Sequence, residues 1–207
     1  TVAEVAARLE LWASFGGPRD TLSALSTRLD SLLASEIPPE SRADVRRTVF
    51  ARAARLAWPT SPLPLGPLTE VRGDYLVSAL TSDLAGDTAA VVRALSDLHE
   101  LRRFWPPRTV SLDAVLTEAA LVAKYEGPLA GASWLDGALG GVRASAPDFD
   151  PANAAALVRA MALRAEFAAA VHESATARRW AIAVTELWHD ADPFLQPLVA
   201  RMRELSR

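Results

Sequence analysis

Apolar residues recur along this chain at the three- and four-residue spacing of an amphipathic helix, and no useful length of sequence alternates between apolar and polar residues. The first segment predicts a helix over residues 2–15 that ends at Gly16-Gly17-Pro18, because glycine and proline stop helices. Asp20 or Thr21 is expected to cap a second helix. The apolar stripe of that helix comprises Leu22, Leu25, Leu29, Leu32 and Leu33.

Prolines divide the chain at two further places. Pro38-Pro39 ends the second helix, and a third helix is predicted over about 40–57. The stretch WPTSPLPLGPLTE, residues 58–70, then holds four prolines and a glycine. It is either a linker or a rigid loop packed on the helices, and its apolar side chains favour the packed loop. We therefore expect one continuous domain, made of the N-terminal helices 1–57, the connection 58–70 and residues 71–207. The N-terminal helices can also be interpreted as one and a half divergent hairpins.

Beyond this connection the predicted helices come in pairs that are joined by short turns. The expected pairs are 68–85 with 88–103, 111–125 with 129–142, and 151–171 with 174–188, followed by a last helix over 193–205. Ser111 and Ser174 are good N-cap residues, and Pro151 suits a first helical turn. Each pair predicts an antiparallel helix hairpin.

The three hairpins share a pattern when their turn residues Gly86, Glu126 and His172 are aligned. Three alanines stand before the turns, and small or apolar residues follow at fixed distances. In order of position, the matching residues are Ala79, Ala119 and Ala165; Val91, Gly131 and Ala177; Leu95, Leu135 and Ala181; and Leu98, Ala138 and Val184. The first two sets let paired helices approach closely, and larger residues in the others fill the space between hairpins.

This pattern resembles the tetratricopeptide repeat (TPR), whose consensus has small residues at the helix crossing and Gly-Asp at the turn. LAGDTAAVVRAL (84–95) and ATARRWAIAVTELW (175–188) are most similar to it. The resemblance covers about residues 68–207, with turn spacings of 40 and 46 residues against about 34 in the family. It implies an all-α fold of about ten helices, whose antiparallel hairpins stack as a right-handed TPR-like solenoid. A related helical repeat or a plain helical bundle is the alternative.

The segment ELWHDADPFLQPLVARMREL (186–205) is similar to the one that closes many bacterial tetratricopeptide arrays, which implies a C-terminal capping helix. Asp190 and Asp192 are expected to cap its free amides, with Pro193 in its first turn and Trp188 in the corner. Its apolar side, expected to cover the last hairpin, comprises Leu195, Leu198 and Met202. Its outer side comprises Arg201, Arg203 and Arg207.

Composition narrows the class of partner. A formal net charge of −3 and a pI near 5.7 argue against a nucleic-acid surface. No cysteine is present, which excludes disulfides and thiolate chemistry, and no apolar run approaches the roughly 18–20 residues of a membrane span. The chain starts at Thr1 rather than Met, so we expect it to be an excised or processed piece of a longer chain. Membership of a larger complex is a separate expectation. A cytoplasmic location is favoured, with a secreted or periplasmic one left open.

Candidate catalytic or metal-binding residues are few. His99, His172 and His189 lie far apart, and capping explains the HDAD motif at His189 without a metal. SFGGPRDT (14–21) lacks the preceding strand and the Gly-Lys-Ser/Thr of a phosphate loop. Glu118 stands among alanines, so it is either a buried carboxylate with a raised pKa or, the favoured interpretation, a residue on the helix edge. No enzyme, metal or cofactor is therefore expected.

The resemblance also implies where a partner binds, because the first helices of TPR hairpins line a concave groove that holds a peptide or helix. The groove residues that it implies are Leu80, Asp83, Asp113, Leu116, Lys124, Arg159 and Glu166. Ordinary solvated helix positions are the alternative for these residues.

A second candidate surface is the predicted loop FWPPRTV (104–110), where Trp105 is the best candidate for an exposed aromatic residue. The contact residues expected there are Arg102, Arg103, Trp105 and Arg108. The tryptophans expected to pack in the core are Trp12, Trp134, Trp180 and Trp188.

Together these features predict a non-catalytic scaffold that binds a protein or peptide partner, of the kind that in bacteria often follows a kinase, a regulator or a membrane anchor. One alternative is a regulatory domain, attached to a kinase or transcription regulator, that senses a small molecule in a closed apolar cavity. Another is a structural subunit of a larger assembly, which predicts exposed leucines in residues 1–57.

Overall fold

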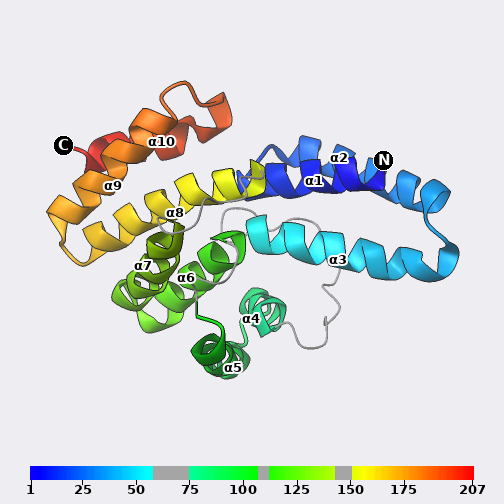
Figure 1. The fold of residues 1–207 in the computed structure, drawn as a ribbon, viewed down its shortest axis with the longest axis horizontal. Helices are drawn as coiled ribbons and strands as arrows, with labels where there is room; N and C mark the ends of the chain where they lie inside the picture. The colour runs from blue at the N-terminus through cyan, green and yellow to red at the C-terminus, as the bar shows by residue number, and fades with distance from the viewer. Residues whose placement is uncertain (58–74, 107–111, 143–150) are drawn as a thin grey trace. The chain divides into compact units, whose positions relative to one another are not determined.

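The structure is a computed structural model that describes residues 1–57, 75–106, 112–142 and 151–207. Within these ranges every regular element is a helix, which confirms the all-α prediction (Figure 1). The chain divides into two compact units, Thr1–Glu100 and Leu101–Arg207. The predicted connection 58–70 and the predicted N-cap Ser111 lie outside the described residues.

The first unit is built around its three N-terminal helices. Its elements are α1 (Val2–Ser14), α2 (Arg19–Glu36), α3 (Pro39–Ala57), α4 (Tyr75–Leu84) and most of α5 (Thr88–Phe104). α1 packs on both α2 and α3 around a core that includes Leu9, Leu29 and Phe50. The stripe predicted for α2 is confirmed, since three of its leucines are buried and the other two pack half-buried against this core.

The start of α2 differs from the prediction. Pro18 is its N-cap, and no side chain makes a capping hydrogen bond there, so the prediction that Asp20 or Thr21 caps this helix is wrong. Asp20 lies in the first turn instead, where its negative charge interacts favourably with the positive end of the helix dipole. The preceding Gly17 packs closely against Trp12: a Cβ on Gly17 would lie 2.5 Å from Cε3 of the Trp12 indole.

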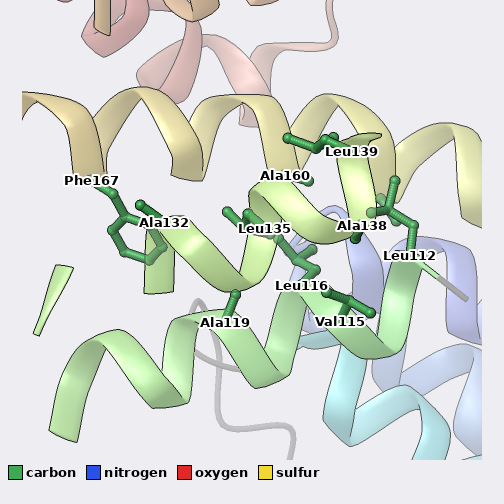
Figure 2. Packing of buried hydrophobic residues seen from close by; sticks show 11 residues of the cluster. Leu112, Val115, Leu116, Ala119, Ala132, Leu135, Ala138, Leu139, Ala160 and Phe167 are labelled. Atoms are coloured by element: carbon green, nitrogen blue, oxygen red, sulfur yellow. The ribbon is translucent and has the colours of Figure 1, made fainter. Parts of the chain in front are cut away.

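The second unit consists of two helix hairpins and a final helix. Its elements are the end of α5, α6 (Leu112–Glu126), α7 (Pro128–Val142), α8 (Pro151–Ala170), α9 (Ser174–Leu187), a short 3-10 turn η2 (Pro193–Leu195) and α10 (Gln196–Leu205). α6 pairs with α7 and α8 with α9, and α8 also packs on α6 and α7. Figure 2 shows this shared core, with Leu135 of α7 at its centre and Phe167 of α8 beside Ala132.

The three predicted hairpin turns are confirmed, and each contains one residue in the left-handed backbone region. These residues are Gly86 with φ 74°, Gly127 with φ 102° and His172 with φ 63°. Glycine adopts this region freely, whereas a side chain such as that of His172 rarely does. The turn around His172 is closed by a backbone hydrogen bond, in which N of the next residue, Glu173, donates to O of Ala168 at 2.8 Å. This bond stabilises the left-handed conformation of His172.

Side-chain caps are used at only some of the helix starts. At α5, Ala90 N donates to the carboxylate of Asp87 at 2.9 Å, which caps the helix. At α9 the N-cap is Glu173 and no side chain accepts a capping bond, so the prediction that Ser174 is the cap is wrong.

The aligned repeat positions are buried in all three hairpins, as the pattern predicted. The three alanines Ala79, Ala119 and Ala165 are fully buried. In the α6–α7 hairpin the small residues Ala119 and Gly131 face each other across the crossing. In the second and third hairpins, whose helices pack closely on each other, the spacing of small residues therefore marks points of close helix packing; α4 and α5 are not packed in this way.

The predicted C-terminal cap is confirmed as a covering helix. α10 packs on α9 and on α8, with Val199 and Met202 fully buried. Leu198 and Trp188 pack half-buried against the same cluster.

The polar part of the capping prediction is wrong. Asp192 is the residue before η2 but makes no side-chain capping bond, and the Asp190 carboxylate lies 2.7 Å from Nε2 of His189 instead. Pro193 begins η2 and not α10, whose own first turn holds Pro197. The polar contact at this corner comes from Gln196, whose side-chain amide donates to Ala191 O at 2.6 Å.

Candidate functional site

A buried ion pair lies where the last turn of α5 meets the α6–α7 hairpin. Nε of Arg102 donates to Oε2 of Glu118 at 3.0 Å, and Nη2 donates to Oε1 of the same carboxylate. The indole nitrogen of Trp134 on α7 donates to Oε2 at 3.0 Å. The side chains of Glu118 and Arg102 are 1% and 12% exposed. Both carboxylate oxygens are therefore satisfied by donors in a site that excludes water.

Glu118 corrects the favoured interpretation of the sequence, which placed it on a helix edge. From Leu112 to Val122, α6 is buried on every side except at Ala114, which is half-buried. A helix covered in this way has no edge on which a carboxylate can reach water, so its charge requires partners within the protein. Arg102 is one of those partners. The prediction that Arg102 is an exposed contact residue is therefore wrong, because its guanidinium points toward Glu118 in the core.

Two aromatic side chains beside this ion pair are exposed. Phe104 is 80% exposed and Trp105 is 62% exposed, which confirms the prediction that Trp105 faces solvent. The segment is the end of α5, since Trp105 N donates to Leu101 O at 3.0 Å. Arg103 is also exposed, as expected. We call Phe104 and Trp105 the aromatic pair; Arg108 lies outside the described residues.

Three of the residues predicted for a concave groove are in fact buried. Leu80 and Leu116 are 2% and 4% exposed, and Asp113 is 5% exposed. Leu116 belongs to the core shared by α6, α7 and α8. The prediction that these three residues line an open groove is therefore wrong: Asp113 and Leu116 lie on α6, which is covered on nearly all sides, and Leu80 lies on the buried side of α4.

The other predicted groove residues stay closer to solvent. Asp83 is half-buried, and Lys124 is exposed with its ammonium 5.6 Å from the centre of the Tyr125 ring. Arg159 is half-buried, and burial lowers the pKa of its guanidinium to about 10. It therefore keeps its charge at neutral pH.

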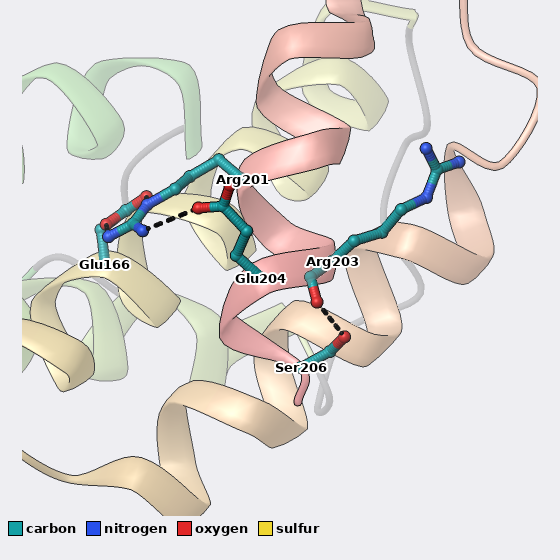
Figure 3. Close-up of polar contacts among 5 residues, drawn as sticks. All are labelled: Glu166, Arg201, Arg203, Glu204 and Ser206. Atoms are coloured by element: carbon teal, nitrogen blue, oxygen red, sulfur yellow. Dashed lines mark hydrogen bonds and ion pairs between the residues drawn. The ribbon is translucent and has the colours of Figure 1, made fainter.

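Glu166, the last predicted groove residue, is committed to a contact with α10. Arg201 donates from Nε and Nη2 to its carboxylate at 3.0 and 3.3 Å, and from Nη1 to Glu204 at 3.2 Å (Figure 3). The hydrogen bonds that Arg201 donates to Glu166 are the main cause that raises its pKa, followed by the bond that it donates to Glu204. Figure 3 also shows Arg203 pointing away from this cluster.

A second arginine–carboxylate pair lies within the same unit. Arg164 of α8, itself buried, donates from Nε and Nη2 to Asp136 of α7 at 2.8 and 3.1 Å. It differs from the Arg102 pair because the Asp136 side chain is half exposed. The sequence carried no signal for this pair, since its members are far apart along the chain.

A pocket of about 460 Å³ lies between the α8–α9 turn, the start of α9 and the end of α10. Its apolar wall includes Ala177 and Leu205, and its polar groups include His172, Arg178 and Arg207. Ser174 and the carboxylate of Glu204 line it as well, so the two arginines outnumber the one acid and the pocket suits a small polar molecule with an anionic group.

A metal site and a membrane span each set requirements on the described residues. Among these residues, no three His, Asp or Glu side chains converge as metal ligands. The described helices include none with the length and apolar character needed to cross a bilayer.

Comparison with known proteins supplies no family for this chain. No model of a protein family, no curated protein and no solved structure matches it.

Proposed function

We propose that this chain is a non-catalytic helical-repeat domain that binds a protein or peptide partner, with its hairpins stacked as a right-handed TPR-like solenoid. The buried small residues at the hairpin crossings and the covering helix α10 support this proposal. Stacked hairpins can display side chains on their outer surface without any rearrangement of the core.

The aromatic pair carries the proposal. An aromatic side chain removes about 150–250 Å² from water when it is covered, so two adjacent exposed rings leave a large hydrophobic gain unused. Aromatic residues also dominate the binding energy of protein interfaces. Phe104 and Trp105 lie on one helix end, and exposed Arg103 stands next to them. We therefore expect the partner to offer an apolar surface at this contact.

The test is capture of a partner from a lysate of the source organism by the whole chain, compared with Phe104→Ala/Trp105→Ala. Both side chains are exposed, so the double variant is expected to fold normally. Leu129→Ala is a matched control, because Leu129 on α7 is also exposed, at 66%. A protein retained by the native chain and the control but lost by the double variant supports the proposal.

Other outcomes of this capture have distinct meanings. Equal retention by all three chains moves the contact away from the aromatic pair and contradicts its role. A set of retained proteins that also changes with Leu129→Ala indicates nonspecific adhesion to apolar residues. No retained protein at any concentration speaks against a binding scaffold.

The pocket beside the α8–α9 turn favours a second function, sensing of a small molecule by a domain attached to a kinase or transcription regulator. Its volume of about 460 Å³ lies in the range of ligand sites, but its lining mixes apolar and polar side chains and it opens to the surface, so it is not the closed apolar cavity that was predicted. A thermal-shift screen of small carboxylates and phosphates, with Arg178→Glu as the control, tests this function.

The third hypothesis, a subunit of a larger assembly, predicted exposed leucines in residues 1–57, and the described residues do not show them. The leucines of α2 are buried or half-buried within their own unit. The described side chains of residues 1–57 include no strongly exposed large apolar residue. The aromatic pair is therefore the better indication of a contact surface.

A further inference from the structure

We infer that the Arg102–Glu118–Trp134 cluster is a positioning device that holds the aromatic pair in one orientation for binding. This inference rests on the proposed function, in which Phe104 and Trp105 contact the partner. The cluster itself touches no partner, so Arg102 and Glu118 are positioning residues.

The aromatic pair has little packing of its own to hold it. With 80% and 62% of their surfaces in water, Phe104 and Trp105 make few packing contacts of their own. The end of a helix also frays easily, because its last carbonyl groups lack partners within the helix. Half-buried Leu101 adds some packing to this turn. A stronger anchor is needed if the two rings are to keep a fixed direction.

Arg102 supplies that anchor from two residues before Phe104. Two nitrogens of its guanidinium meet both oxygens of one carboxylate. A planar guanidinium bound at two points fixes direction as well as distance, which a single-point lysine contact does not. The last turn of α5, and with it the aromatic pair, therefore takes its orientation from Glu118.

The Glu118 side chain is held in one position because its surroundings leave it no other rotamer with access to water. Its side chain is 1% exposed on a helix that is covered on all sides. Trp134 holds Oε2 from a second helix, which sets the plane of the carboxylate. If Arg102 left, a buried charge would lose its counter-charge, so movement of the α5 end is strongly disfavoured.

A fixed aromatic pair has a functional consequence. Side chains that are already ordered lose less conformational freedom when a partner covers them, so binding is tighter for the same contact. The cluster thus adds affinity at a surface that it does not itself form.

The test uses the whole chain with 5-fluorotryptophan and ¹⁹F NMR, which reports on each of the six tryptophans without any partner. Trp105→Phe and Trp134→Phe assign the two resonances. Glu118→Gln removes the charge but keeps an oxygen that accepts from Trp134. Its matched control is Asp136→Asn, which weakens the Arg164 pair in the same unit.

We expect Glu118→Gln to shift and broaden the Trp105 resonance, while Asp136→Asn leaves it unchanged. Amide hydrogen exchange over residues 101–105 should quicken by roughly fivefold to a hundredfold in Glu118→Gln alone. A Trp134 resonance that moves while Trp105 and the exchange rates stay unchanged would overturn the inference, because the cluster would then act only locally.

A milder variant keeps the test decisive if Glu118→Gln unfolds. Arg102→Lys retains the positive charge but loses the two-point contact, and we expect an intermediate change at Trp105. An unchanged Trp105 signal in a folded Arg102→Lys chain would again contradict the inference.

Failure of the inference and failure of the proposed function are separable. If Trp105 moves as expected but Phe104→Ala/Trp105→Ala still retains the partner, the proposed contact fails and the positioning effect stands. If the double variant loses the partner but Trp105 ignores the cluster, the contact stands and the positioning role fails.

Discussion

Gly131 of α7 lies so close to Ala119 of α6 that a Cβ on the glycine would be 2.8 Å from the Ala119 carbonyl oxygen. The same Cβ would lie 2.6 Å from Cβ of Ala123 and 2.8 Å from a ring carbon of Phe167. A backbone oxygen cannot turn aside as a flexible side chain can. The two helices therefore approach here at a distance that only glycine permits.

This contact predicts that Gly131→Ala destabilises the protein although alanine favours helices. Overpacking typically costs about 1–3 kcal/mol, whereas the gain in helix propensity is at most about 1 kcal/mol. Gly140, also on α7, is the matched control because a Cβ there meets nothing within 4 Å. Urea unfolding of both variants is the measurement. A Gly131→Ala midpoint at or above that of the native chain would show that the crossing is looser than described.

Ala165 tests the crossing in the third hairpin. It is fully buried in the cluster that α8 shares with α9 and α10, so Ala165→Leu should lower the free energy of unfolding by about 1–3 kcal/mol. Ala170→Leu on the same helix is the control, because Ala170 is exposed. Equal unfolding midpoints for the two leucine variants would contradict the close packing.

The buried ion pair predicts a large asymmetry between single and double substitutions. Arg102→Ala leaves the Glu118 charge uncompensated in a dry site, which should cost about 3–5 kcal/mol in the free energy of unfolding. Arg102→Met/Glu118→Gln removes both charges, keeps an oxygen that accepts from Trp134, and should recover most of that loss. Thermal unfolding of the two variants measures the difference, and a double variant no more stable than Arg102→Ala contradicts it.

The C-terminal helix predicts that packing outweighs charge in holding α10. Met202 is fully buried, and Met202→Ala should cost about 2–5 kcal/mol in the free energy of unfolding. The exposed Arg201 contributes through ion pairs that salt screens, so Arg201→Ala should have a much smaller effect that fades as salt is added. Denaturant unfolding at low and high salt separates the two effects. A larger loss for Arg201→Ala would reverse this order.

Removal of residues 193–207 tests the role of α10 as a cover. The truncation exposes the apolar sides of α8 and α9, including Val184, and should lower solubility and broaden the unfolding transition. A soluble truncation that unfolds as sharply as the whole chain would show that α10 is not a cap.

Local chemistry in the sequence determined the helices and their turns. The leucine stripe of α2, the glycines of the first two turns and the alanines at the crossings each act through near neighbours or a regular period. These features can be recognised in the sequence because helices and turns are formed by residues that are close together along the chain. The covering face of α10 was predictable for the same reason, through the spacing of Leu198 and Met202.

Contacts between distant segments were decided only by the tertiary structure. Whether Glu118 meets water depends on how many sides of α6 are covered, and whether Leu80 and Leu116 line a groove depends on what packs against them. Periodicity identifies one apolar face of a helix but not the number of neighbours around it. Arg102 on α5 and Glu118 on α6 are 16 residues apart in the sequence, and only the packing of these two helices brings them together. This packing buries most of the arginine side chain and places it beside the exposed aromatic pair.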